Sequence, residues 1–125
     1  MGNLGPDSLG RETFWLYLGA MSPVAPLSLL SATLVSDSSL EGWSLLDTSN
    51  GADRFFRYGV SFNSSFSVPP VVHVGLVGLD VSREDNLRVR VRAVDITVNG
   101  FTLLAETWLH TQIWSLEVSW VAIGS

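Results

Sequence analysis

The sequence predicts an all-β protein, a six-stranded antiparallel β-sandwich with an apolar N-terminal arm. From residue 42 onward, short apolar or alternating segments are separated by polar, glycine and proline turns, a pattern typical of sandwiches. No stretch shows the period of an amphipathic helix over a convincing length. A chain of 125 residues without cysteine is long enough to bury one such core without disulfide bonds.

The arm comes first in the chain. Residues 13–36 carry no charge, and this uncharged stretch reaches the length of a membrane span. Pro23 and Pro26 interrupt it, and its flanks lack the basic bias that orients a spanning helix. No net positive region precedes it, as a secretory signal would require. The sequence therefore favours neither a membrane span nor a signal peptide.

The two prolines divide the arm into apolar pieces of strand length, residues 14–21 and 27–35. Two interpretations stay open. In one, these pieces are strands that pack on their own domain. In the other, the arm packs on neighbouring subunits or docks the protein into a larger assembly. We place the domain boundary after residue 41, with the arm at residues 1–41 and the sandwich at residues 42–125.

Turns divide the sandwich into six predicted strands. Asn-Gly pairs mark turns at residues 50–51 and 99–100, and paired prolines end a break at residues 69–70. The segment 71–80 is almost continuously apolar, so we expect it to be covered on both faces. The predicted strands are residues 42–47, 55–62, 71–80, 86–96, 101–108 and 112–123.

The C-terminal stretch TWLHTQIWSLEVSW holds three tryptophans and one histidine. Trp120 alternates in phase with the apolar residues of the last strand, so we expect it in the core. Trp108 and His110 end a strand and enter a turn, where a site can be built on a rigid edge. Trp114 is ambiguous, because alternation groups it with the core while its position at the start of the strand places it near that edge.

Composition excludes several classes of function. The formal net charge of −5 argues against nucleic acid as a partner, since phosphate binding depends on clustered positive charge. Cys-based metal and redox sites are impossible without cysteine. The acidic turn at residues 80–86 lacks the glycine and terminal glutamate of a calcium-binding loop. No nucleophile, phosphate-loop or metalloprotease motif occurs, so we expect neither an enzyme, a metal nor a cofactor.

Two patterns leave alternatives open. Arg88, Arg90 and Arg92 share one face of a strand. Three interpretations stay open: the arginines pair with acids across a subunit contact, they bind an acidic ligand, or they face solvent. His73 lies inside the apolar segment 71–80, where a hydrogen-bonded structural histidine is favoured over a ligand-binding one.

The order of blocks from residue 62 onward carries a family resemblance. The run VPPVVHVGLVGLD is followed by NLRVRV, by a Gly-Phe turn before TWLHT, and by a strand ending VSWVAIG. Together they resemble the H-type lectin domain, the family of the snail agglutinin and the discoidin C-terminal domains, over residues 42–124. The resemblance implies a six-stranded sandwich that forms a homotrimer, sometimes stacked into a hexamer, with sugars bound in clefts between subunits.

The same resemblance implies a set of carbohydrate-binding residues. It assigns sugar contact to Arg88 of the Asn-Leu-Arg block, to Trp108 and to Trp114, with aromatic faces covering sugar rings. The snail lectin has its sugar-binding histidine directly after the tryptophan, whereas here Leu109 intervenes before His110. The loop that carries the family's acidic residue is shorter here, and Asp53 is the nearest candidate, with Asp47 behind it.

The sequence thus supports a trimeric carbohydrate-binding protein as its first functional hypothesis. Its expected ligands are glycans such as N-acetylgalactosamine or a bacterial surface polysaccharide, and its expected setting is a virion, as in a phage tail or spike adhesin, or a cell surface. The arm would then dock on virion or tail proteins. The alternative is a structural trimeric virion or tail component that uses the lectin fold for assembly without binding sugar.

Overall fold

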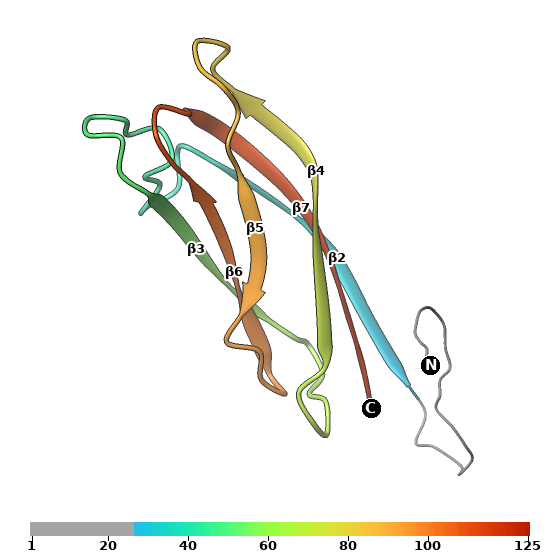
Figure 1. Ribbon diagram of the computed structural model, residues 1–125. Helices are drawn as coiled ribbons and strands as arrows, with labels where there is room; N and C mark the ends of the chain where they lie inside the picture. The colour runs from blue at the N-terminus through green and yellow to red at the C-terminus, as the bar shows by residue number, and fades with distance from the viewer. Residues whose placement is uncertain (1–26) are drawn as a thin grey trace, which may run out of the picture.

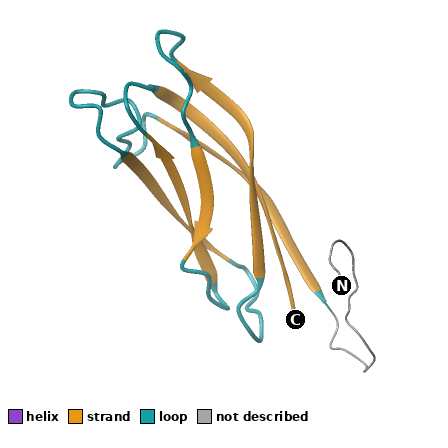
Figure 2. Cartoon of the chain, viewed as in Figure 1, coloured by secondary structure: helices purple, strands orange, loops and turns teal. Residues whose placement is uncertain are grey.

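A computed structural model describes residues 27–125 and builds them into two packed antiparallel sheets, drawn as two layers in Figure 1. Figure 2 shows only strands and loops in this part of the chain. The prediction of an all-β antiparallel sandwich of six strands is confirmed. The strands are β2 (Ser28–Asp37), β3 (Arg54–Ser61), β4 (Val71–Val81), β5 (Arg90–Val94), β6 (Gly100–Thr107) and β7 (Ile113–Gly124).

Each sheet has three strands, with the orders β2-β7-β4 and β3-β6-β5. The central strands are β7 and β6, which follow each other in the chain, so the loop between them crosses from one sheet to the other. The inner faces of both sheets supply the core, with alternate residues of each strand pointing inward. The buried apolar residues are Leu45, Phe56, Phe62, Phe66, Phe101, Leu103, Ala105, Ile113, Leu116, Val118 and Ala122.

Trp120 packs against this core, as its phase in the last strand predicts. Its ring centroid lies 5.3 Å from that of Phe101 and 5.8 Å from that of Phe62. Aromatic pairs at these separations stabilise a core beyond their buried area. Trp120 is therefore a structural residue.

The first strand of the sandwich comes from the segment that the sequence analysis assigned to the arm. Strand β2 pairs with β7 from the Ser28–Gly124 pair to the Asp37–Ser115 pair. Residues 28–35 thus belong to a strand of the sandwich, which the sequence analysis had placed in the arm at residues 1–41. The other apolar piece, residues 14–21, lies outside the described residues.

The strand predicted at residues 42–47 is not formed, and this prediction was wrong. Gly42 has a φ of 84°, a left-handed conformation that breaks an extended segment. Trp43 and Leu45 instead close the end of the core: the indole Nε1 donates to the carbonyl of Ile113 at 2.9 Å, and Leu45 is fully buried. Their apolar character thus reflects burial of a turn and not strand pairing.

The cover expected on both faces of residues 71–80 is present on one face only. Val72, Val74 and Leu79 pack on the core, whereas the opposite face of β4 is exposed within the chain. His73 lies on that open face opposite Val121 and makes no hydrogen bond to the described residues. The hydrogen bond expected of a structural histidine is not formed among the described residues of a single chain, which leaves this face without its second cover.

Among residues 27–125, no helix is long and apolar enough to cross a membrane.

Candidate functional site

The candidate site lies at the end of the sandwich where three loops meet, the upper end in Figure 1. These loops connect β2 to β3, β4 to β5 and β6 to β7. The strand termini fix their positions, because Arg54 at the start of β3 pairs with Thr107 at the end of β6. The Thr107 hydroxyl donates to the carbonyl of Arg88, which holds the segment before β5 against the same end.

These contacts align three of the predicted site residues. Asp53 precedes Arg54, Trp108 follows Thr107, and Arg88 is itself the residue whose carbonyl accepts from the Thr107 hydroxyl. Arg54 and Thr107 are buried, so alternation places their neighbours Asp53 and Trp108 on the outer side of the sheet. Arg88 lies two residues before β5, and its guanidinium donates to the carbonyl of Asn86 at 3.4 Å. When the β3-β6 and β6-β5 registers are continued past the strand ends, Asp53 and Arg88 both fall opposite Trp108, so the three residues form one row at this end of the β3-β6-β5 sheet.

Trp108 occupies the centre of this row and is held by a cation. The guanidinium carbon of Arg90 lies 5.1 Å from the centroid of the indole ring. A cation over an aromatic face is attracted by the ring quadrupole. The side chain is half-buried, so part of the indole stays available to a ligand.

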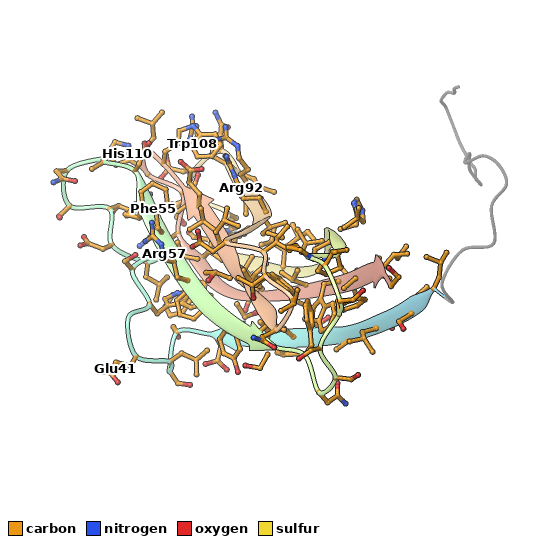
Figure 3. All side chains as sticks on the ribbon, turned by 90° about the horizontal axis from the view of Figure 1, so that it is seen from below. Glu41, Phe55, Arg57, Arg92, Trp108 and His110 are labelled. Atoms are coloured by element: carbon orange, nitrogen blue, oxygen red, sulfur yellow. The ribbon has the colours of Figure 1, made fainter. Side chains whose placement is uncertain are left out.

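His110 lies in the loop after Trp108, at the same end in Figure 3. It packs over Gly51: a Cβ at that position would lie 3.8 Å from the ring atoms Cε1 and Nε2. Leu109 donates its N–H to the carbonyl of Gly51 at 3.1 Å, which joins the two loops. The sequence expectation of His110 at a rigid edge agrees with this position, and its imidazole is exposed.

A buried arginine that the sequence analysis missed ties these loops together. Arg54 is only 7% exposed and donates to four main-chain carbonyls. Its partners are Ala52 at 3.2 Å, Leu45 at 3.1 Å, Thr111 at 2.9 Å and Leu109 at 2.7 Å. Burial lowers the pKa of Arg54 from its usual value, although a guanidinium stays charged at any ordinary pH. The sequence did carry a sign of this role, because Arg54 is in phase with the buried Phe56 of the same strand.

Asp47 supports one of the loops from within. Its carboxylate accepts the N–H of Ser49 at 3.0 Å, as in an Asx turn. This backbone hydrogen bond, followed by that of the Ser49 side chain and only weakly by the charge of Arg54, holds the pKa of Asp47 below its usual value. Asp47 therefore acts in turn formation, and Asp53 is the acid that adjoins Trp108.

Trp114 lies on the other sheet. The ladder between β4 and β7 shifts so that Asp80 pairs with Ser115 and Val81 with Ile113, which leaves Trp114 as an extra residue. A bulge of this kind turns the side chain out of the regular alternation. Ile113 is fully buried and Trp114 is 47% exposed, so Trp114 does not share the core face. Trp108 and Trp114 belong to the same end of the sandwich but to the outer sides of different sheets.

Two of the three arginines on the shared strand face find an acid within the chain. Arg90 and Arg92 contact one carboxylate oxygen of Glu106 at 3.1 Å and 3.5 Å. Glu106 comes from the neighbouring strand β6. The acid that pairs with these two arginines is therefore Glu106 of the same chain. One interpretation of the sequence had expected an acid from a neighbouring subunit.

Metal-ligating side chains do not gather in the described part of the chain: no three His, Asp or Glu residues there are placed to hold an ion. The site can offer a half-buried indole, an exposed imidazole, a carboxylate and guanidinium groups. This set suits hydrogen bonding to hydroxyl groups and stacking on a ring.

The H-type lectin domain model matches residues 57–123, more than half of the chain. This chain belongs to the H-type lectin family. The family and its fold are typical of binding proteins rather than enzymes. The resemblance inferred from the sequence is therefore confirmed, and the match includes Arg88, Trp108, His110 and Trp114 but not Asp53.

Solved structures of discoidin II from Dictyostelium discoideum share the fold. One superposes with a TM-score of 0.69 at 22% identity, covering 84% of this chain and 40% of that chain. A second gives a TM-score of 0.66 at 24% identity, covering 81% and 39%. This H-type lectin thus spans about two fifths of the length of discoidin II.

Among curated sequences, a product of Fuscovulum blasticum described as ATP synthase subunits region ORF 7 is 38% identical over 78 residues, which are 62% of this chain and 67% of that protein.

The loop residue between Trp108 and His110 has an unusual backbone. Leu109 has a φ of 58°, in the left-handed region that costs most residues free energy. Its carbonyl accepts from Arg54 and its N–H donates to Gly51, so the conformation is imposed from two sides. This geometry sets the spacing between the indole and the imidazole in this H-type lectin.

We expect Leu109→Gly to raise the free energy of unfolding by about 0.5 kcal/mol. Relief of the left-handed strain, worth about 1–2 kcal/mol, should exceed the entropy that glycine adds to the unfolded chain, about 0.4–1 kcal/mol. Urea unfolding measures the change. Leu87→Gly is the matched control, because Leu87 is also exposed but has no positive φ, and it should be destabilised. Equal losses in both variants would contradict the argument.

Proposed function

We propose that this H-type lectin binds carbohydrate at the end of the sandwich that carries Asp53, Trp108, Arg88 and His110. The observation that supports the proposal is the row Asp53–Trp108–Arg88, in which the continued register puts Asp53 and Arg88 on the segments on either side of the half-buried Trp108. Indole faces cover the apolar side of a sugar ring, while charged groups bond its hydroxyls. N-acetylgalactosamine and bacterial surface polysaccharides are the proposed ligand classes.

The proposed binding unit is a homotrimer, or a hexamer of stacked trimers, that meets through the outer face of the β2-β7-β4 sheet. Support comes from a row of exposed apolar residues across its three strands, namely Leu29 at 63%, Ile123 at 40% and Val71 at 73%. A single chain leaves such a row in water, which is a sign of an interaction surface.

Such an assembly would also bring Trp114 to the site. Trp114 lies on the outer side of the proposed contact sheet, whereas Trp108 lies on the outer side of the other sheet. We propose that the cleft between copies forms at this loop end, with Asp53, Arg88, Trp108 and His110 of one copy on one wall and Trp114 of a neighbouring copy on the other. Symmetric sites of this kind give avidity on repetitive glycan surfaces.

The proposed setting is a virion or cell surface, with the protein acting as an adhesin, for instance on a phage tail or spike, that recognises host glycans. Residues before 27 would then dock the trimer on its carrier. A structural component that keeps the lectin fold for assembly alone is the second candidate. It is favoured by one observation: Leu109, an exposed apolar residue, follows Trp108 where the resemblance leads us to expect a histidine.

A glycan array tests the proposed function, with the full chain presented beside its Trp108→Ala and Arg88→Gln variants. We expect the wild type to bind a defined set of glycans and both variants to lose at least about tenfold in affinity. Arg83→Gln is the charge-matched control, because Arg83 lies exposed in the turn after β4 and outside the row. A trimer that binds no glycan, or variants that bind as well as the wild type, would leave the structural candidate.

A further inference from the structure

The outer face of the β3-β6-β5 sheet, next to the row that carries Trp108, presents several arginine side chains. Strand register arranges this face in two cross-strand rows. The first is Phe55, Glu106 and Arg90, and the second is Arg57, Leu104 and Arg92. We name these six residues the arginine face. Figure 3 labels Phe55, Arg57 and Arg92 together with Trp108.

The arginine face carries more positive than negative charge, in a chain whose net charge is −5. Three guanidinium groups, of Arg57, Arg90 and Arg92, share the face with the single carboxylate of Glu106. Glu106 is itself buried and contacts both Arg90 and Arg92. The carboxylate therefore orients two guanidinium groups but cannot neutralise three.

The guanidinium groups keep most of their hydrogen-bonding capacity. The side chains of Arg90 and Arg92 are 51% and 48% exposed, and each donates a single hydrogen bond, to Glu106, among the described residues. Arg57 is exposed and donates none to those residues. Because each guanidinium carries several N–H donors in a planar fork, the free donors suit an anionic group such as a carboxylate or sulfate.

Aromatic rings lie beside these cations. The guanidinium carbon of Arg57 lies 5.4 Å from the ring centroid of Phe55, and that of Arg90 lies 5.1 Å from that of Trp108. Phe55 and Trp108 thus restrict where the cations sit, which lowers the entropy lost on binding. Rings beside cations fit a sugar that carries an acid better than a small free anion, because the ring can stack while the acid is bound.

We propose that the arginine face binds the acidic groups of an anionic glycan, with Arg57 and Arg92 as the residues that select for charge. Glu106 positions Arg90 and Arg92 by its ion pairs. The inference rests on the proposed carbohydrate-binding function and deepens it, because the face extends the site from Trp108 along the sheet. The ligand class becomes a polysaccharide with carboxylate or sulfate groups.

The test compares ligands that differ only in charge: polygalacturonate with its methyl ester, and dextran sulfate with dextran. We expect wild-type protein to bind both anionic polymers, with an affinity that falls as sodium chloride rises, and to bind the neutral forms at least about tenfold more weakly. Arg57→Gln/Arg92→Gln should lose at least about tenfold toward the anionic polymers. Arg90 is kept, because it also holds the Trp108 ring.

Controls separate the site from general charge. Arg83→Gln removes one charge outside both the arginine face and the Asp53–Trp108–Arg88 row, and it should retain more than half of the wild-type affinity for dextran sulfate. Arg57→Gln and Arg92→Gln, which each remove one charge from the arginine face, should retain less than half. Equal losses in these three single variants, or equal binding of charged and neutral polymers, would overturn the inference. A wild type that binds neutral glycans on the array but neither anionic polymer overturns the inference alone. A wild type that binds no glycan of any kind overturns the proposed function with it.

Discussion

Replacement of Arg54 by alanine should lower the free energy of unfolding by about 3–5 kcal/mol, since the change removes charge-assisted hydrogen bonds worth about 1.5–3 kcal/mol each and leaves the carbonyl of the buried Thr111 without its partner. The guanidinium holds the carbonyls of Leu45, Ala52, Leu109 and Thr111, which belong to two different loops. No other described side chain bonds to the carbonyls of Leu109 and Thr111. Denaturant unfolding at neutral pH measures the loss.

The buried hydrogen bonds of Arg54 distinguish it from the exposed residues of the same strand. Arg57→Ala should change the free energy of unfolding by less than about 0.5 kcal/mol, because Arg57 is exposed and donates no hydrogen bond to the described residues. Arg54→Lys should recover only part of the loss, since an ammonium cannot reach four carbonyls with a planar fork. Equal effects at Arg54 and Arg57 would show that charge, and not the buried network, sets the stability.

Loss of Arg54 should also loosen the candidate site. Leu109 and Thr111 flank His110, so its loop keeps its shape through the two bonds from Arg54. In the Arg54→Lys variant we expect hydrogen exchange of the amides at residues 108–112 to become faster than in the wild type while the strands stay protected. Unchanged exchange there would contradict a positioning role.

The strands of the sandwich were predictable because alternation and turn residues are local properties. Residues 55–62, 71–80, 101–108 and 112–123 each overlap a strand of the structure. Local pattern could not distinguish residues 42–47, whose apolar side chains close the core from a turn, from a true strand. It also could not choose a partner for residues 27–35, since that choice depends on which edge of the β7 ladder is open.

The candidate site was predictable only in part, for a similar reason. Trp108 and His110 were named as candidates because they lie where a strand ends, and Arg88 was named because its Asn-Leu-Arg block resembles that of the family. The outward position of Trp114 depends on a shift in the β4–β7 register, which the period of the sequence does not reveal. The burial of Arg54 was not predicted, because a charged residue is expected at the surface. Only its four carbonyl partners explain why it is buried. Glu106 was missed as the partner of two arginines, since cross-strand neighbours depend on register.

Leu29→Asp should convert the proposed trimer to a monomer at micromolar concentration. Leu29 belongs to the exposed apolar row with Ile123 and Val71, and its side chain points away from the core of its own chain. An aspartate at that position would be buried without a partner in the assembly, at a cost of several kcal/mol per subunit, on the order of a thousandfold in affinity. Analytical ultracentrifugation measures the mass directly.

The single chain should stay folded in the Leu29→Asp variant. A lower mass would then report loss of the trimer and not unfolding. The thermal midpoint, extrapolated to low protein concentration, should stay within a few degrees of the wild-type value, because the substituted side chain is already exposed within one chain. Leu87→Asp is the matched control: Leu87 is a comparably exposed leucine outside the β2-β7-β4 sheet, and the variant should stay trimeric.

The consequence for binding follows from the proposed cleft. A monomer lacks the neighbouring Trp114 wall and the avidity of several sites, so binding to a glycan-coated surface should fall by at least about a hundredfold. Affinity for a single soluble sugar reports the Trp114 contribution separately from avidity. A Leu29→Asp variant that remains trimeric would show that copies meet through another surface. A monomeric variant with full affinity for the soluble sugar would place Trp114 outside the cleft and leave the Asp53–Trp108–Arg88 row to bind alone.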